Sequence, residues 1–216
     1  MITLGDSERR TLIALGRRQL DWNANLGARI ISTESAMGIY TTPPMDVMCF
    51  LAVPAHTGNE EIDRTIALSA LIDELDSQDS GTFDPESFAE VRTPVTRGPN
   101  LGHLPPSDGW QMPITAIASD IMPIVDEAVG EFNRRAQGLT PRGQEVIAEE
   151  IWDRPAWAGL PMRVLHAARR LRLLTPEPVR IAAATSGPWK RLSTPRGQVF
   201  VHSTGEAARL GLHVVR

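Results

Sequence analysis

The sequence predicts an α+β protein, in which a mixed α/β body is followed by a C-terminal helix and a three-stranded antiparallel meander. The 216 residues have an ordinary globular composition, 42% hydrophobic and 22% charged, and suffice for one full core. Helical and alternating apolar patterns follow one another in the first part, and short strand-like runs separated by proline–glycine turns end the chain. We expect a body over 1–138 and a helical segment with a basic module over 139–216, which could also pack as one domain.

The body is expected to begin with a helix and two strands. Asp6 or Ser7 is placed to cap a helix that reaches about Trp22, because an apolar stripe at helical spacing follows. Residues 28–33 predict a short strand. Residues 47–53 predict another strand, apolar on both faces, which is typical of a central strand in a covered sheet.

A second helix is expected from Thr57 to about Leu75. Thr57 and Glu60 have the spacing of a capping box, and a buried stripe at helical spacing ends at Leu75. Ile62 and Ile66 fall on a different side of this helix, so the sequence does not define which side is buried.

The next segment, residues 77–113, is rich in proline and glycine. A structureless connection of that length is unusual inside a compact domain. We therefore expect either a strand near 87–91 or a working loop.

The second half of the chain begins with two helices. Asp120 is expected to cap a helix with Pro123 in its first turn, where proline is tolerated. Thr140 followed by Pro141 predicts the start of the next helix, which ends near Trp152. The last expected elements are a helix over 162–174 and strands over 179–184, 189–193 and 198–202.

Charge is distributed very unevenly along the chain. Residues 1–162 carry 24 acidic and 12 basic side chains, whereas residues 163–216 carry 10 basic and 2 acidic ones. A formal net charge of −4 therefore hides a strongly dipolar chain. Such asymmetry points to an acidic partner.

The candidate binding residues lie on the expected C-terminal helix and around the turns of the meander. Arginine favours planar, two-point recognition of acidic groups, and an aromatic ring beside it adds a contact surface. The candidates are Arg163, Arg169, Arg170, Lys190, Arg191, Arg196 and Trp189.

Three interpretations of this cationic surface remain open. The leading hypothesis is a non-enzymatic interaction protein whose cationic surface binds an acidic protein partner or the acidic body of its own chain. The alternative is a nucleic-acid-binding protein with a winged-helix-like module, since a helix followed by a β-ribbon with arginines on both suits that design. Nucleic acid is the less favoured partner, because the remaining 162 residues would repel DNA and the stretch before the helix is long for a helix-turn-helix.

A small-molecule enzyme is a further alternative, although the sequence leans against catalysis. The nucleophile elbow, the zinc-binding His-Glu-x-x-His pattern and the glycine-rich phosphate loops are absent from the sequence. The loop over 101–110 is the best candidate site, with His103 and Asp108 as the weak catalytic candidates near Trp110. Serine, aspartate, proline and glycine are also what an ordinary turn uses, so a structural loop pinned by Trp110 is the competing interpretation.

The sequence predicts neither a metal site nor a cofactor. The five histidines are scattered singly, and Cys49 is the sole cysteine, which excludes an internal disulfide. Cys49 lies in an apolar run, so we expect a buried, inert thiol. We also expect a cytoplasmic protein without membrane contact, because no apolar stretch reaches 18 residues and the N-terminus has no signal-peptide pattern. The oligomeric state is not predicted.

The C-terminal quarter resembles a group of uncharacterised actinobacterial proteins. The resemblance is carried by the run GPWKRLSTPRGQVFV from Gly187 to Val201, together with LHAARRL from Leu165 to Leu171. It implies no activity, since the group has none attached to it. It does imply a bacterial, cytoplasmic setting.

Overall fold

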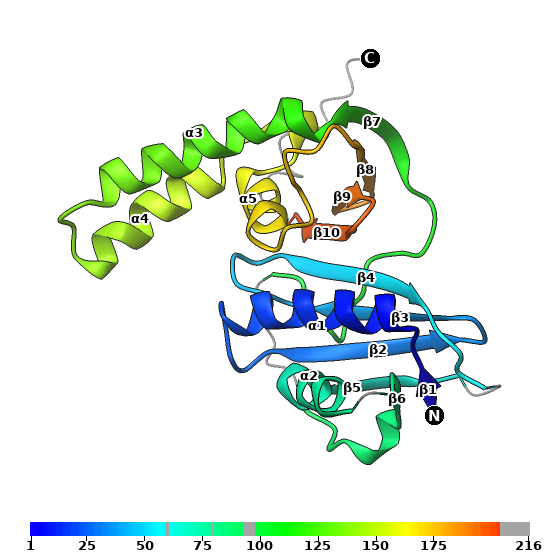
Figure 1. Cartoon of the computed structure of the whole chain (residues 1–216). Coiled ribbons are helices and arrows are strands. Elements are labelled where there is room, and N and C mark those ends of the chain that lie inside the picture. Colours follow the sequence, from blue (N-terminus) through cyan, green and yellow to red (C-terminus); the bar gives the residue numbers. More distant parts are fainter. Residues whose placement is uncertain (59–60, 79, 93–97, 204–216) are drawn as a thin grey trace. The chain divides into compact units, whose positions relative to one another are not determined.

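The structure, a computed structural model, describes residues 1–58, 61–78, 80–92 and 98–203. The chain forms two compact units, Met1–Pro105 and Pro106–Arg216. Each unit combines an antiparallel sheet with helices, which confirms the α+β fold class (Figure 1). The division differs from the one expected at residue 138, because the helix that ends at Ala136 packs against the helices that follow it.

The N-terminal unit is built on four antiparallel strands in the order β5-β2-β3-β4. Register is set by apolar pairs such as Ile30 opposite Ile39, and Ile39 opposite Leu51. A separate two-stranded ladder pairs β1 with β6. The strand bounds are β1 Ile2–Thr3, β2 Gly27–Thr33, β3 Ala36–Thr41, β4 Met48–Pro54, β5 Asp63–Ala67 and β6 Thr82–Phe83.

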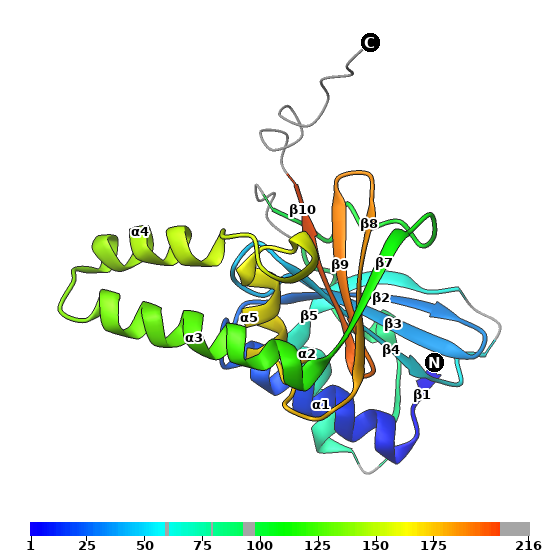
Figure 2. The ribbon, with the colours of Figure 1, turned by 90° about the horizontal axis from the view of Figure 1, so that it is seen from above.

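Two helices, α1 (Asp6–Leu20) and α2 (Leu68–Ser77), lie side by side over the same face of this sheet (Figures 1 and 2). Alternate residues of β2 and β3 are buried, as expected when one face is covered. A buried hydrogen bond of 2.5 Å, from the Thr41 hydroxyl to Oε1 of Gln19, ties α1 to β3. The core of this unit therefore lies between the helix pair and the sheet.

Two sequence-based expectations for this unit are wrong. The helix predicted from Thr57 begins only at Leu68, because Asp63–Ala67 forms strand β5 and pairs with β2. Thr57 does not cap a helix: its hydroxyl donates to the carbonyl of Thr33. The off-stripe position of Ile66 was the sign of this strand, since Ile66 is fully buried in β5.

The start of α1 also differs from the expectation. Gly5 occupies the N-cap without a side-chain hydrogen bond, whereas Asp6 is the first helical residue. Its carboxylate lies in the first turn, where it complements the positive end of the helix dipole.

The proline-rich segment is mostly irregular but anchored. A short 3-10 helix spans Pro85–Ser87, and an isolated bridge pairs Ile66 with Glu90. The backbone N–H of Val91 donates to the carbonyl of Thr65 at 2.9 Å. The expected strand near 87–91 is therefore reduced to one bridge, and residues 93–97 lie outside the described residues.

The C-terminal unit has four antiparallel strands in the order β10-β9-β8-β7. The predicted meander is confirmed by the last three, β8 Arg180–Ser186, β9 Trp189–Thr194 and β10 Gly197–His202. Strand β7 (Gln111–Ile117) was not predicted, because Pro113 interrupts it. Proline is tolerated there since β7 is at the edge of this order and its register with β8 shifts between Gln111 and Ile114.

The helices of this unit are α3 (Ala118–Ala136), α4 (Pro141–Trp152) and α5 (Met162–Arg170). The predicted cap of α4 is confirmed, since the Thr140 hydroxyl accepts from the backbone N–H of Gly143 at 3.3 Å. The predicted cap of α3 is wrong: α3 begins at Ala118 with Ile117 as its N-cap, so Pro123 lies inside the helix.

Helices α3 and α4 form an antiparallel hairpin that projects from the C-terminal sheet (Figure 2). Four charged side chains link the two helices to the loop after α4. Arg135 and Arg154 each contact both Glu131 and Glu150, at 2.5–2.8 Å. The arginines lower the pKa of both glutamates to about 2 by hydrogen bonding.

Candidate binding pocket

Helix α5 is largely buried within its unit. Most of its residues are inaccessible to solvent, and it packs against α3, α4 and β10. His166 stacks on Trp152 with ring centroids 4.3 Å apart, and burial, aided by Arg170 and Arg169, lowers its pKa to about 4. Only Arg170 is exposed among the residues of α5. A recognition helix must present one face to the major groove, which this buried helix does not do.

Three of the predicted binding arginines form ion pairs with carboxylates of the same unit. Arg169 contacts Asp126 of α3 at 2.5 Å. Arg163 contacts Asp153, which follows α4. Arg196 makes a two-point contact with Glu177, at 2.8 and 2.9 Å. Part of the cationic charge is therefore compensated inside the C-terminal unit.

Three of the other candidates lie on strand β9, and the fourth, Arg170, is the exposed last residue of α5. Lys190 donates from Nζ to the carbonyl of Gly159 at 2.6 Å, a neutral acceptor. The guanidinium of Arg191 lies 4.2 Å from the ring centroid of Trp110, and burial lowers its pKa. Trp189 is buried and meets His202 edge-on, with ring centroids 4.8 Å apart. Trp189 thus acts as a core residue, whereas Lys190 is half-buried at the surface.

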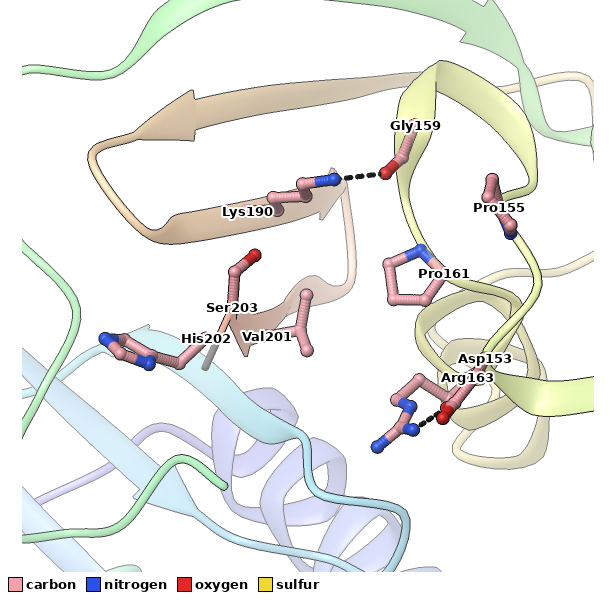
Figure 3. A pocket seen from close by; sticks show the side chains of 9 residues that line it. All are labelled: Asp153, Pro155, Gly159, Pro161, Arg163, Lys190, Val201, His202 and Ser203. Atoms are coloured by element: carbon pink, nitrogen blue, oxygen red, sulfur yellow. Dashed lines mark hydrogen bonds and ion pairs between the residues drawn. The ribbon is translucent and has the colours of Figure 1, made fainter. Parts of the chain in front are cut away.

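A pocket of about 330 Å³ lies between the loop after α4 and strands β9 and β10 (Figure 3). Two of the predicted binding residues, Arg163 and Lys190, line it. The complete lining is Asp153, Pro155, Gly159, Pro161, Arg163, Lys190, Val201, His202 and Ser203.

The loop that forms one wall is held by its own backbone. The N–H of Ala156 donates to the carbonyl of Leu160 at 2.7 Å, and the N–H of Met162 donates to the carbonyl of Arg154 at 2.9 Å. Gly159 adopts a φ of 70°, a left-handed conformation that glycine adopts without strain. This turn directs the Gly159 carbonyl toward Lys190 (Figure 3).

The charged groups occupy two separate parts of the pocket. Figure 3 shows Lys190 on one side and the Arg163–Asp153 pair on the other, with Pro161 and Val201 between them. The Arg163 side chain is 19% exposed and that of Asp153 is 54% exposed. The carboxylate is therefore the more accessible member of the pair.

A smaller, mostly apolar niche of about 80 Å³ also borders Lys190. Ile114 of the edge strand β7 lines it and is 46% exposed. The other lining residues are Ala158, Leu160, Ala183, Ala184 and Thr185. Lys190 thus belongs to both a cationic pocket and an apolar niche.

The weak catalytic candidates have the surroundings of a surface turn. His103 and Asp108 are both exposed. Trp110 donates from its indole N–H to the carbonyl of Pro106 at 3.0 Å, and its ring contacts Phe200 and Arg191. These contacts favour the structural interpretation of Trp110, which holds the end of the loop.

Cys49 is a buried thiol, as expected from its apolar surroundings in the sequence. Complete burial raises the pKa of the Cys49 thiol to about 12, so it is not a reactive thiolate at neutral pH. Within the part of the chain that the structure describes, no cluster of three or more histidine, cysteine or acidic side chains could hold a metal ion. Among the same residues, no helix has the length and apolar content needed to cross a bilayer.

Sequence reasoning missed the contribution of the loop between α4 and α5. Pro155, Gly159 and Pro161 form a pocket wall, and no sequence pattern pointed to a binding role for them. The sequence pattern likewise gave no sign that Glu150 contacts two arginines. These loop residues are close together in the sequence, but β9, the strand that faces them across the pocket, is distant in the sequence.

Comparisons with known proteins find a family match for part of the chain and a similar fold for nearly all of it. Residues 105–206 match a family described as a domain of unknown function (DUF8185). This agrees with the expected resemblance to an uncharacterised group. No curated protein matches the sequence.

Solved structures with a similar fold include bacterial DNA polymerase sliding clamps. The Caulobacter crescentus β sliding clamp is 11% identical, with a TM-score of 0.58 over 97% of this chain and 67% of the clamp. The Pseudomonas aeruginosa clamp is 9% identical, with a TM-score of 0.54 over 95% of this chain and 66% of the clamp. The chain therefore spans about two thirds of the clamps' length. At this identity the likeness establishes the fold alone.

Proposed function

We propose that this chain is a non-enzymatic interaction protein whose C-terminal unit binds an acidic segment of a partner protein. The observation that carries the proposal is the pocket beside β9, because two cationic side chains from separate elements, Lys190 and Arg163, line it. Lys190 is central, since it has no carboxylate partner among the described residues and its hydrogen bond goes to a neutral carbonyl.

The fold supports a role in an assembly. The Caulobacter crescentus and Pseudomonas aeruginosa proteins of similar fold are described as subunits of DNA polymerase III. Their fold serves there as part of a larger complex, which is consistent with an interaction protein here.

The acidic body of the chain is a weaker candidate partner than an external one. Arg163, Arg169 and Arg196 already have carboxylate partners within the C-terminal unit. Exposed pairs of this kind contribute only about 0–1 kcal/mol each. They locally reduce the cationic charge, but they leave the charge of Lys190 available to a ligand.

Nucleic acid is less well supported than an acidic protein. Helix α5 is largely buried in its unit, so it cannot serve as the exposed recognition helix that a winged-helix protein places in the major groove. The net charge of −4 also disfavours a polyanion with charge along its whole length.

Fluorescence anisotropy tests the proposal directly. The probe is a short labelled peptide rich in aspartate and glutamate that contains one leucine, and the controls are its glutamine/asparagine counterpart and a DNA duplex of equal charge. We expect the acidic peptide to bind at about 50 mM salt and to be released at about 500 mM, since salt screens exposed charges. Absence of peptide binding would refute the proposal, and tighter binding of the duplex would favour the nucleic-acid alternative.

A further inference from the structure

We infer that the two cavities that share Lys190 form one composite site for a peptide in which a small aliphatic side chain is followed by carboxylates. The aliphatic side chain enters the niche of about 80 Å³, and the carboxylates enter the pocket of about 330 Å³. This inference rests on the proposed function and specifies the site and the ligand class.

Lys190 connects the two parts of the site. An ammonium carries three donors, and one of them reaches the Gly159 carbonyl at 2.6 Å. The carbonyl fixes the direction of the side chain without neutralising its charge. A ligand carboxylate can therefore accept from the other two donors, beside the residues that border the niche.

The apolar niche distinguishes a peptide from other anions. Ile114, Leu160 and the two β8 alanines offer a surface that an aliphatic side chain covers favourably, since burying apolar area stabilises by about 25 cal/mol per Å². A phosphate or a nucleic-acid backbone presents no such group next to its charge. An extended peptide places both groups on neighbouring residues.

Asp153 competes with a ligand carboxylate for Arg163, the second cation of the pocket. It pairs with Arg163, and its side chain is 54% exposed against 19% for Arg163. A ligand carboxylate that replaces Asp153 conserves the ion pair, so the exchange costs little. It also follows that Asp153 weakens binding, both by competition and by like-charge repulsion.

The test uses the full chain and the leucine-containing acidic peptide in the same anisotropy assay. Two variants probe the site, Lys190→Gln and Asp153→Asn, and each has a control with the same charge change outside the pocket. Arg180→Gln matches the first and Glu149→Gln matches the second, since Arg180 and Glu149 are exposed and line neither cavity.

We expect Lys190→Gln to weaken binding about fivefold and Asp153→Asn to strengthen it about threefold, whereas each control changes the Kd by less than about twofold. Replacing the peptide leucine with serine should weaken binding to the wild type, but by a smaller factor than Lys190→Gln. Asp153→Asn is expected to fold, because Asp153 is an exposed C-cap residue.

The outcomes separate this inference from the proposed function. If the peptide binds but Asp153→Asn and Glu149→Gln behave alike, the site assignment is wrong and the proposed function stands. If inorganic phosphate displaces the labelled peptide as well as N-acetylaspartate does, and replacing the peptide leucine with serine leaves the Kd unchanged, the site is a general anion site and the inference is overturned. If the peptide does not bind at all, the proposed function fails with it.

Discussion

Replacing His166 with phenylalanine should remove a pH dependence from the stability of the C-terminal unit. His166 lies against Trp152 and beside Arg169 and Arg170, and burial followed by these charges lowers its pKa from 6.5 to about 4. The folded state therefore binds fewer protons than the unfolded state between these pH values. Stability is complete above pH 6.5 and is lost as the pH falls from 6.5 toward 4.

The magnitude follows from the two pKa values. At about 1.36 kcal/mol per pKa unit, the full difference corresponds to at most about 3 kcal/mol. Because solvent reaches part of the ring, we expect about 1–2 kcal/mol between pH 7 and pH 5. The lowered pKa values of Glu131 and Glu150 act in a different window, since their contribution is lost only as the pH falls from 4.5 toward 2.

Urea unfolding at pH 7, 6 and 5 measures this effect, with His166→Phe against the wild type and His103→Gln as a control at an exposed histidine. The phenylalanine keeps a ring against Trp152 and cannot titrate. A wild-type stability that is flat between pH 7 and pH 5, or a His166→Phe variant with the same slope, would refute the reasoning. An NMR titration of the His166 ring in the wild type gives the pKa without relying on the variant.

Two further predictions concern helix packing and capping. Gly16→Ala should destabilise the N-terminal unit by about 1–3 kcal/mol in thermal melts, because the new Cβ would clash with Cδ1 of Ile72. Gly130→Ala in α3 is the control: its Cβ has room, so the same melts should show no change or a stabilisation of up to about 1 kcal/mol. Thr140→Ala should cost about 1 kcal/mol through loss of the Gly143 hydrogen bond, and Thr140→Ser should restore it; equal stability of both variants would exclude a capping role.

Sequence patterns located those elements whose signals are local. Thr140 and Pro141 predicted the start of α4, and turns at glycine and proline predicted the C-terminal meander. The capping-box spacing from Thr57 misled, because pairing of β5 with β2 outweighed a local helix signal. Strand β7 was not predicted, because Pro113 argues against a strand. The structure accommodates this proline since β7 lies at the edge of its sheet order.

The site was predictable only in part. The charge asymmetry indicated Arg163 and Lys190, but nothing in the sequence indicated which cations have carboxylate partners. Asp153 is ten residues from Arg163, and Lys190 is 31 residues from Gly159, so these contacts depend on how α5 and β9 pack. Trp189 is a predicted contact residue, but the structure buries it against His202.

Hydrogen–deuterium exchange of the full chain, with and without the leucine-containing acidic peptide, tests the central claim most directly. Binding at the composite site should slow exchange in the loop over 154–162 and in strands β9 and β10. At a peptide concentration near the wild-type Kd, Lys190→Gln should clearly reduce that protection, because its binding is about fivefold weaker. The N-terminal unit and the tip of the α3–α4 hairpin should exchange as before. Protection that appears elsewhere, or that is unchanged in Lys190→Gln at the same peptide concentration, would contradict the account.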